Sequence, residues 1–476
     1  MLFNSLEFLI FFVFIISLYF TLPHKYRWIL LLVSSYYFYM CWRAEYVILI
    51  IISTFIDYFS GILIEYFKEK RKKRIFLLIS LFINLGLLFT FKYYNFFTNS
   101  LTLLFKPLNM MQNLPSFNLL LPVGISFYTF QTLSYTIDVY RGQKVAEKHF
   151  GIFALYVSFF PQLVAGPIER STRLIPQFHK KQIFDYERVR SGLLLMLVGF
   201  FKKVVVADNL SHYVDSIFNH AHILQGPPFI FATIFFGFQI YCDFSGYSDI
   251  AIGVARIMGF DLMKNFNLPY FSKSIREFWG RWHISLSSWF KDYVYFPLGG
   301  NRVKKSRWIF NIFIVFALSG LWHGANWTFI IWGLLHSFYY MFSIGFENPI
   351  TRFNSLLKRL LGIKLANLIR ISITYIFVHF AWIFFRANSL KDALHIVSSL
   401  TKHSKNFWGV ADVKFIPIYF FLIGILIIFM ILRNDKNIYR RFVTAPLSIR
   451  WSFYLISVIF IIMFHGSSSN FIYFQF

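Results

Sequence analysis

The sequence predicts an all-α polytopic membrane protein. Of its 476 residues, 57% are hydrophobic and only 14% are charged, whereas charged residues make up about a quarter of a soluble globular domain. The mean hydropathy of +0.57 points the same way. Apolar runs of the length of a membrane helix also recur along the whole chain. A soluble globular fold is therefore excluded.

The apolar runs predict about 11 to 13 transmembrane or re-entrant helices. Several runs are shorter than the roughly 20 residues that cross a bilayer upright, so we expect some of them to re-enter or to lie buried in protein. The run 308–346 is long enough for one crossing and a turn into another. In chain order the runs are residues 6–22, 28–42, 46–67, 75–91, 119–139, 150–165, 192–207, 229–241, 308–346, 368–385, 415–432 and 451–464.

The chain has no internal repeat and no linker rich in Gly, Ser or Pro, which predicts one integral membrane domain over residues 1–476. Within it, residues 261–307 are too polar to span a bilayer but are dense in aromatic side chains, so we expect an interfacial or re-entrant segment there. The first run, 6–22, has no basic residue before it and no small-residue cleavage site after it. We therefore expect a retained helix rather than a signal peptide.

Lys and Arg in the short loops predict the orientation. The strongest basic block, 68–74, should be cytoplasmic, together with 24–27 and 433–441, which leaves 41–45 and the N-terminus outside. A formal charge of +26 would suggest nucleic acid for a soluble protein. Here the positive-inside rule and attraction to anionic lipid explain it, so membrane lipid and not nucleic acid is the expected partner.

His323 is the first candidate for chemistry. It lies in Ser-Gly-Leu-Trp-His-Gly-Ala-Asn, inside the stretch 308–346 that contains no Lys, Arg, Asp or Glu. An ionisable side chain at membrane depth is costly and is a functional candidate by default. Gly320 and Gly324 have the spacing that lets another helix, or a thin substrate arm, approach the backbone closely.

A second candidate lies 40 residues earlier, in the aromatic segment 274–289. His283 follows Trp279, Arg281 and Trp282, a mixture of charge and large rings that is typical of an interfacial helix or of the mouth of a cavity. These three residues are candidates for substrate binding. An aromatic belt with snorkelling arginines is the structural alternative for the same pattern.

Five motifs accompany the two histidines. They are PVGISFY (122–128), FFPQLVAGPIER (159–170), YCDFSGYSD (241–249), RWHISL (281–286) and FIYFQF (471–476). Together they resemble the membrane-bound O-acyltransferase family, in particular its bacterial alginate O-acetyltransferase-like branch, and the similarity extends over essentially the whole chain. The resemblance implies a helical bundle around a central tunnel, open to the cytoplasm for the acyl donor and to the outside for the acceptor. It maps the family's catalytic histidine onto His323 and its partner histidine onto His283.

The resemblance also implies the reaction. An acetyl group from a cytoplasmic thioester, acetyl-CoA as the donor substrate with no bound cofactor, would cross the bacterial cytoplasmic (inner) membrane for O-acetylation of an extracytoplasmic polysaccharide. The acceptor would be an alginate-like exopolysaccharide or peptidoglycan, with an extracytoplasmic hydrolase-like partner protein completing the transfer. D-alanyl transfer to teichoic acid from a carrier-protein thioester is the alternative within this class. A secondary transporter or flippase is the alternative outside it, although the chain lacks two related halves.

The chemistry agrees with these assignments. Attack of a hydroxyl on a thioester needs a base that works near neutral pH and a group that stabilises the oxyanion. Histidine has the nearest unperturbed pKa, so His323 is the expected general base. His283, Asn326 and a nearby backbone amide are the candidates for orienting the donor or holding the oxyanion, and spacing does not choose among them.

Phosphates of the donor would need basic side chains at the cytoplasmic mouth. Arg302, Lys304 and Lys305 shortly precede the run that contains His323. If one helix runs from Trp308 to His323, it rises about 22 Å, which is comparable to an extended pantetheine arm. Any cytoplasmic loop would show a similar basic cluster, so the phosphate role is one of two interpretations.

Other reactive groups have structural explanations. Asp243 and Asp249 are expected to pair with Arg256 or Arg281, or to cap helices, rather than to bind a metal or act as acids, and no metal site is predicted. Cys242 lies in apolar surroundings that leave a thiol inert, and no Gly-Xaa-Ser-Xaa-Gly elbow is present. Direct transfer is therefore favoured over an acyl-enzyme.

Overall fold

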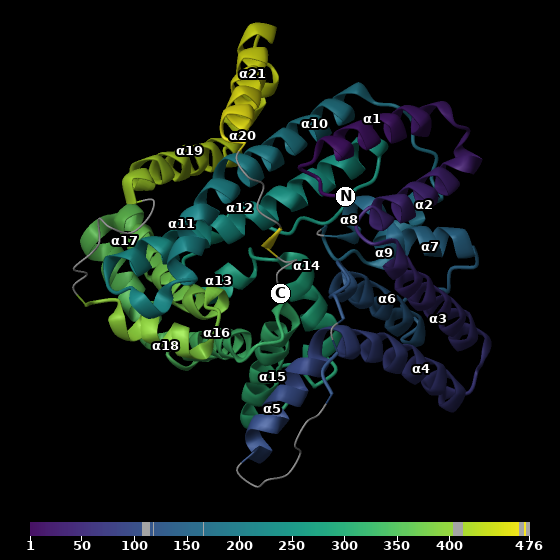
Figure 1. Ribbon diagram of the computed structural model, residues 1–476, viewed down its shortest axis with the longest axis horizontal. Helices are drawn as coiled ribbons and strands as arrows, with labels where there is room; N and C mark the ends of the chain where they lie inside the picture. Colours follow the sequence, from purple (N-terminus) through teal and green to yellow (C-terminus); the bar gives the residue numbers. More distant parts are fainter. Residues whose placement is uncertain (107–114, 118, 165, 403–412, 466–470, 473–476) are drawn as a thin grey trace. The chain divides into compact units, whose positions relative to one another are not determined.

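The computed structural model describes residues 1–106, 115–117, 119–164, 166–402, 413–465 and 471–472 (Figure 1). Every regular element in these ranges is a helix, which confirms the predicted all-α class. The chain packs as two compact units, Met1–Met196 with Ile250–Met263 and Leu197–Asp249 with Lys264–Phe476. Helices α10 and α12 contribute residues to both units. A single functional domain over the whole chain stays a prediction.

The first unit holds the N-terminal helices. In it α3, α4 and α6 pack against one another, and α2 packs against α7 (Figure 1). Its helices are α1 (Leu6–Thr21), α2 (His24–Met40), η1 (Ala44–Tyr46), α3 (Val47–Tyr66), α4 (Lys70–Leu88), η2 (Phe89–Tyr93), α5 (Tyr94–Phe105), α6 (Ile125–Tyr140), α7 (Phe150–Ser158), α8 (Phe160–Leu163), α9 (Ser171–Phe178), most of α10 (Tyr186–Phe200) and the end of α12 (Pro227–Met258).

A buried polar cluster joins α3, α4 and α6. Asp57 on α3 accepts hydrogen bonds from the hydroxyl of Ser80, from the hydroxyl of Thr136 at 2.9 Å and from the amide of Asn84 at 2.8 Å. Ser53 in turn donates to the amide oxygen of Asn84 at 2.6 Å. A buried carboxylate is tolerated when its oxygens are hydrogen-bonded, so this cluster fixes the three helices in one register.

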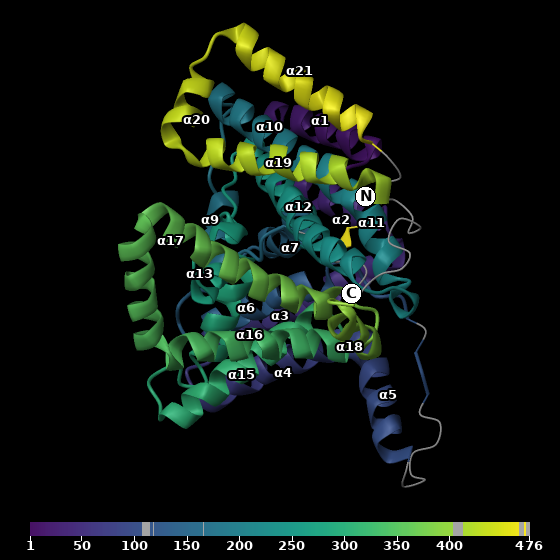
Figure 2. The same ribbon diagram turned by 90° about the vertical axis from the view of Figure 1, so that its left-hand side faces the viewer.

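The second unit holds the remaining helices. In it α15 packs against α16, and α16 against α17 (Figure 2). Besides its parts of α10 and α12, the helices are η4 (Phe201–Ala207), α11 (Asp208–Phe218), η5 (Ala221–Ile223), η6 (Pro269–Phe271), α13 (Ile275–Trp279), α14 (Ile284–Phe290), η7 (Lys291–Tyr295), α15 (Lys305–His323), α16 (Trp327–Gly345), α17 (Glu347–Arg386), α18 (Leu390–Ser399), η9 (Val413–Phe415), α19 (Ile416–Asn434), α20 (Lys436–Val443) and α21 (Leu447–Met463).

By length and composition, six helices in the described residues can cross a membrane. They are Ala44–Tyr66, Lys70–Phe105, Pro227–Met258, Trp327–Gly345, Glu347–Arg386 and Val413–Asn434, and α1 and α21 are shorter apolar helices. The expected 11 to 13 elements included runs that form shorter or more polar helices. Residues 150–165 are an example, because α7 and α8 are both short and almost wholly buried, as expected for pieces that do not cross.

One helix extends well beyond its apolar run, and one predicted segment has the expected short helices. Helix α12 does not end with its run at residue 241 but continues to Met258, through Asp243 and Asp249. These carboxylates stay within the helix because buried lysines pair with them. The predicted interfacial segment 261–307 contains η6, α13, α14 and η7, and no helix in it is long enough to cross a bilayer, as predicted.

Candidate active site

His323 is the last residue of α15. The sequence places it deep in an apolar helix, whereas the structure places it at a helix end, followed by Gly324 in extended conformation. Asn326 then caps α16, because its side chain accepts a hydrogen bond from the backbone N–H of Thr328 at 3.0 Å. Glycine and an N-capping asparagine are ordinary signals for ending one helix and starting another. His323 is nevertheless only 2% exposed.

Glycines bring α15 and α16 close together next to His323. A Cβ atom on Gly320 would lie 2.2 Å from the carbonyl oxygen of Phe329, and one on Gly333 would lie 2.2 Å from that of Phe316. Both distances are far below van der Waals contact, so only glycine fits at either position. The close helix approach predicted from the spacing of Gly320 and Gly324 is confirmed at Gly320, whereas Gly324 lies beyond the end of the helix. This packing makes a stiff support for the histidine.

His283 lies in the turn between α13 and α14, at φ +42°. A residue other than glycine keeps this left-handed conformation only where its surroundings hold it there. Asn265 does so from both ends of its side chain and from its backbone. Its carbonyl oxygen accepts from the N–H of Ile284 at 2.9 Å, its Oδ1 accepts from the Ser285 hydroxyl at 2.6 Å, and its Nδ2 donates to Ser248 at 3.2 Å.

The two histidines lie next to each other. Their ring centroids are 6.3 Å apart with an interplanar angle of 61°, and His283 is 1% exposed. Aromatic rings surround the pair, at centroid distances of 4.6 Å from His283 to Phe244 and of 5.1 Å and 5.3 Å from His323 to Trp332 and Phe385. Such a site excludes water and strengthens electrostatic interactions inside it.

Burial lowers the pKa of His283 from 6.5 to about 3, so its ring is neutral at physiological pH. Unfolded histidine takes up a proton near pH 6.5, whereas the folded protein resists it. The stability contributed by this group is therefore fully present above pH 6.5 and is lost as the pH falls towards 3.

We accordingly expect acidification from pH 7 to pH 5 to remove about 2 kcal/mol of stability through His283. The measurement is the free energy of unfolding of the detergent-solubilised protein as a function of pH, for the wild type and for His283→Gln. The variant should lose less stability than the wild type over this interval. Equal losses in both proteins would contradict a depressed pKa at His283.

The predicted tryptophans belong to the aromatic surroundings of the histidines. The indole N–H of Trp279 donates to Nδ1 of His336 at 3.3 Å, and its ring centroid lies 5.7 Å from that of Trp332, the neighbour of His323. Trp282 is fully buried, with a centroid distance of 5.1 Å to Trp382. Sequence reasoning did not single out Trp332 or the neighbouring rings, because one aromatic residue in an aromatic helix gives no signal of its own.

The predicted polar site residues are spread more widely. Arg281 forms an ion pair with Glu277 at 2.6 Å, and the side chain of Asn326 is engaged as a helix cap. Arg302, Lys304 and Lys305 are exposed where α15 begins. The structure confirms that α15 is one continuous helix up to His323, so these basic residues lie about 27 Å of helix away from the histidine.

Asp243 forms a buried ion pair and Asp249 a partly exposed one, so both pair as predicted but with other partners. Asp243 pairs with Lys203 at 2.7 Å, and Asp249 pairs with Lys202 at 2.7 Å, not with Arg256 or Arg281. Both lysines belong to η4, a π-helical turn whose wider spacing cannot be read from the sequence. The carboxylates are therefore structural partners of buried cations.

Comparison with known proteins places this chain in a family. Residues 148–378 match the sequence profile of the MBOAT, membrane-bound O-acyltransferase family. The chain is 33% identical to the peptidoglycan O-acetyltransferase of Helicobacter pylori, over 94% of this chain and 91% of that protein. It is 36% identical to the probable alginate O-acetylase AlgI of Pseudomonas aeruginosa, over 94% and 83% of the two chains.

A third relative shares only part of the chain. The teichoic acid D-alanyltransferase of Bacillus subtilis is 31% identical over 57% of this chain and 70% of its own. The long apolar helices make this a multi-pass membrane protein. Because the chain is more than 30% identical, over nearly its full length, to two relatives that are named for O-acetylation, it belongs to the membrane-bound O-acyltransferase family and is an O-acyltransferase.

Proposed function

We propose that this protein passes an acetyl group from acetyl-CoA in the cytoplasm across a bacterial cytoplasmic membrane for O-acetylation of an envelope polysaccharide. The observation that carries the proposal is the buried pair of His283 and His323. Two relatives that match 94% of the chain are named for acetylation of peptidoglycan and alginate. The proposed acceptor is therefore peptidoglycan or an alginate-like exopolysaccharide.

In this proposal His323 is the general base. As the base, its imidazole takes the proton of the acceptor hydroxyl while the oxygen attacks the thioester carbonyl. The tetrahedral intermediate collapses, the carbon–sulfur bond breaks, and the departing thiolate receives the proton from His323. The acetyl group is then an ester on the acceptor, and the base is regenerated.

His283 is the better candidate for the oxyanion. Its neutral ring offers one N–H donor within a dry site, where a donor aimed at developing charge is most effective. The side chain of Asn326 is instead occupied at both ends, by the N–H of Thr328 at 3.0 Å and the carbonyl of Asn388 at 3.5 Å. Trp279, Arg281 and Trp282 would then shape the surrounding pocket.

The basic cluster at the start of α15 suits the donor. Arg302, Lys304 and Lys305 would bind the phosphates of acetyl-CoA, with their long side chains and the extended pantetheine arm together covering the about 27 Å of helix to His323. An acyl-enzyme on Cys242 is disfavoured because that thiol is packed among the apolar side chains of the core, where a thiol is unreactive. Membership of an acyltransferase family also argues against the alternative of a secondary transporter or flippase.

The test follows radiolabelled acetyl from acetyl-CoA in membranes that contain the protein. We expect label in peptidoglycan or exopolysaccharide, measured in parallel fractions, with and without an extracytoplasmic hydrolase-like partner. Labelled D-alanine with its carrier protein forms the parallel arm, since one relative is a D-alanyltransferase. Transfer from the carrier but not from acetyl-CoA would reject acetylation in favour of D-alanylation.

Asn265 is expected to act as a positioning residue for His283. Asn265→Leu removes the hydrogen bonds to Ser285 and Ser248 that hold the His283 turn. A shift of about 1 Å at the site would lower kcat up to about 100-fold. Asn265→Asp keeps the oxygen that accepts from Ser285 and should retain most activity. If both variants behave alike, with unchanged KM and kcat, Asn265 does not position the histidine.

A further inference from the structure

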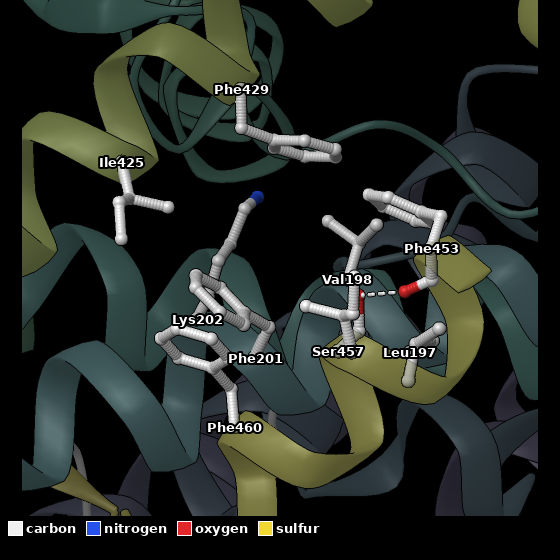
Figure 3. A pocket seen from close by; sticks show the side chains of 10 residues that line it. Leu197, Val198, Phe201, Lys202, Ile425, Phe429, Phe453, Ser457 and Phe460 are labelled. Carbon is white, nitrogen blue, oxygen red and sulfur yellow. Dashed lines mark hydrogen bonds between the residues drawn. The ribbon is translucent and has the colours of Figure 1, made fainter. Parts of the chain in front are cut away.

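An apolar cavity of about 260 Å³ opens between η4, α19 and α21 in the second unit (Figure 3). Phe453, Ile456, Ser457 and Phe460 of α21 line it from one helix face, since their spacing of three and four residues places them on the same side. Leu197 and Val198, near the end of α10, line it as well. The cavity is larger than the roughly 150 Å³ apolar cavity that holds a benzene molecule.

One cation lies among these apolar side chains. The ammonium group of Lys202 points between Ile425 and Phe429 (Figure 3) and binds Asp249 at 2.7 Å. Arg433 contacts the same carboxylate oxygen at 3.5 Å. Two cations thus share one carboxylate, and the side chain of Arg433 remains 41% exposed. The group carries a surplus positive charge beside an apolar cavity.

The geometry of α19 joins the charge to the cavity. Arg433 is one turn beyond Phe429 and about 12 Å of helix beyond Ile425. The next helix, α20, adds the exposed Arg440 and Arg441. A ligand with an anionic head and an extended hydrocarbon chain matches this arrangement of charge and apolar surface. The cytoplasmic leaflet supplies such molecules as anionic phospholipids.

We propose that this cavity is a binding site for one acyl chain of an anionic phospholipid, whose phosphate binds Arg433 and Lys202. Such a lipid fills the space between α21 and η4 and completes the packing of the C-terminal helices. The site is separate from the histidine pair, and the proposal does not depend on the acyl group that the enzyme transfers.

Photocrosslinking tests the proposal. The purified full-length protein is reconstituted in phosphatidylcholine vesicles that contain a small fraction of a probe lipid with a diazirine at the end of one acyl chain. The probe is phosphatidylglycerol in one sample and phosphatidylcholine in the other. Mass spectrometry then maps the labelled peptides. We expect labelling of the α19 and α21 residues at the cavity. The anionic probe should label them about fivefold more strongly, which is the gain in binding that one basic residue near an anionic membrane surface provides.

Variants distinguish binding of the lipid's acyl chain from binding of its head group. Val198→Trp and Ser457→Phe fill the cavity and should each abolish this labelling, whereas Arg433→Gln should remove only the preference for the anionic probe. Ile428→Trp, at a 59% exposed position of α19, is the matched control and should label like the wild type. Undiminished labelling in both filled variants, or equal labelling by the two probes in the wild type, would overturn the proposal.

Discussion

Replacing His323 by alanine is expected to lower the rate of acetyl transfer by at least about 100-fold. A positioned general base contributes about 10²- to 10⁴-fold to such reactions, and the buried site offers no bulk water to replace it. His323→Gln, which keeps a polar side chain but not a base, should lose as much. The measurement is labelled acetyl transfer at matched protein levels in membranes.

The control is His212→Ala, which removes an exposed histidine elsewhere in the second unit. It should retain wild-type transfer. His283→Ala, measured alongside, tells whether the second ring is needed equally. If His323→Gln works at the wild-type rate, the assignment of His323 as the base is wrong even though the fold and the family stand.

The second large effect concerns stability. Lys203 is fully buried and bridges Asp208 at 2.8 Å and Asp243 at 2.7 Å, while Asp243 also accepts the backbone N–H of Ile472 at 2.7 Å. Lys203→Met would leave two buried carboxylates without their cation. Breaking a buried ion pair on one side costs about 3–5 kcal/mol, so we expect this variant to unfold at much lower denaturant concentration.

A matched comparison isolates the charge. Lys202→Met removes the neighbouring lysine, but Asp249 keeps Arg433 at 3.5 Å, so its loss of stability should be smaller. Adding Asp208→Asn and Asp243→Asn to Lys203→Met should restore part of the stability, because no unpaired charge remains. Equal midpoints for the two lysine variants would show that Lys203 does not act as the shared cation. Unfolding in detergent, followed by circular dichroism, gives the midpoints.

The sequence predicted several features of the site from local signals alone. An ionisable residue in the apolar stretch made His323 a candidate, Gly320 indicated the close approach of another helix, and the polarity of residues 261–307 excluded a crossing there. Each of these features follows from side-chain chemistry within one turn or one loop, so the amino-acid sequence was sufficient to predict it. Of the closing motif, residues 473–476 lie outside the described ranges.

Other features were decided by contacts between distant segments. The left-handed conformation of His283 depends on Asn265, and the partners of Asp243 and Asp249 depend on the π-helical turn that presents Lys202 and Lys203. The sequence by itself thus determined that this is an all-α membrane protein with two histidines of interest. The tertiary structure alone decided which rings, amides and cations surround them, because hydrophobic patterning fixes which segments are buried but not which buried polar groups meet.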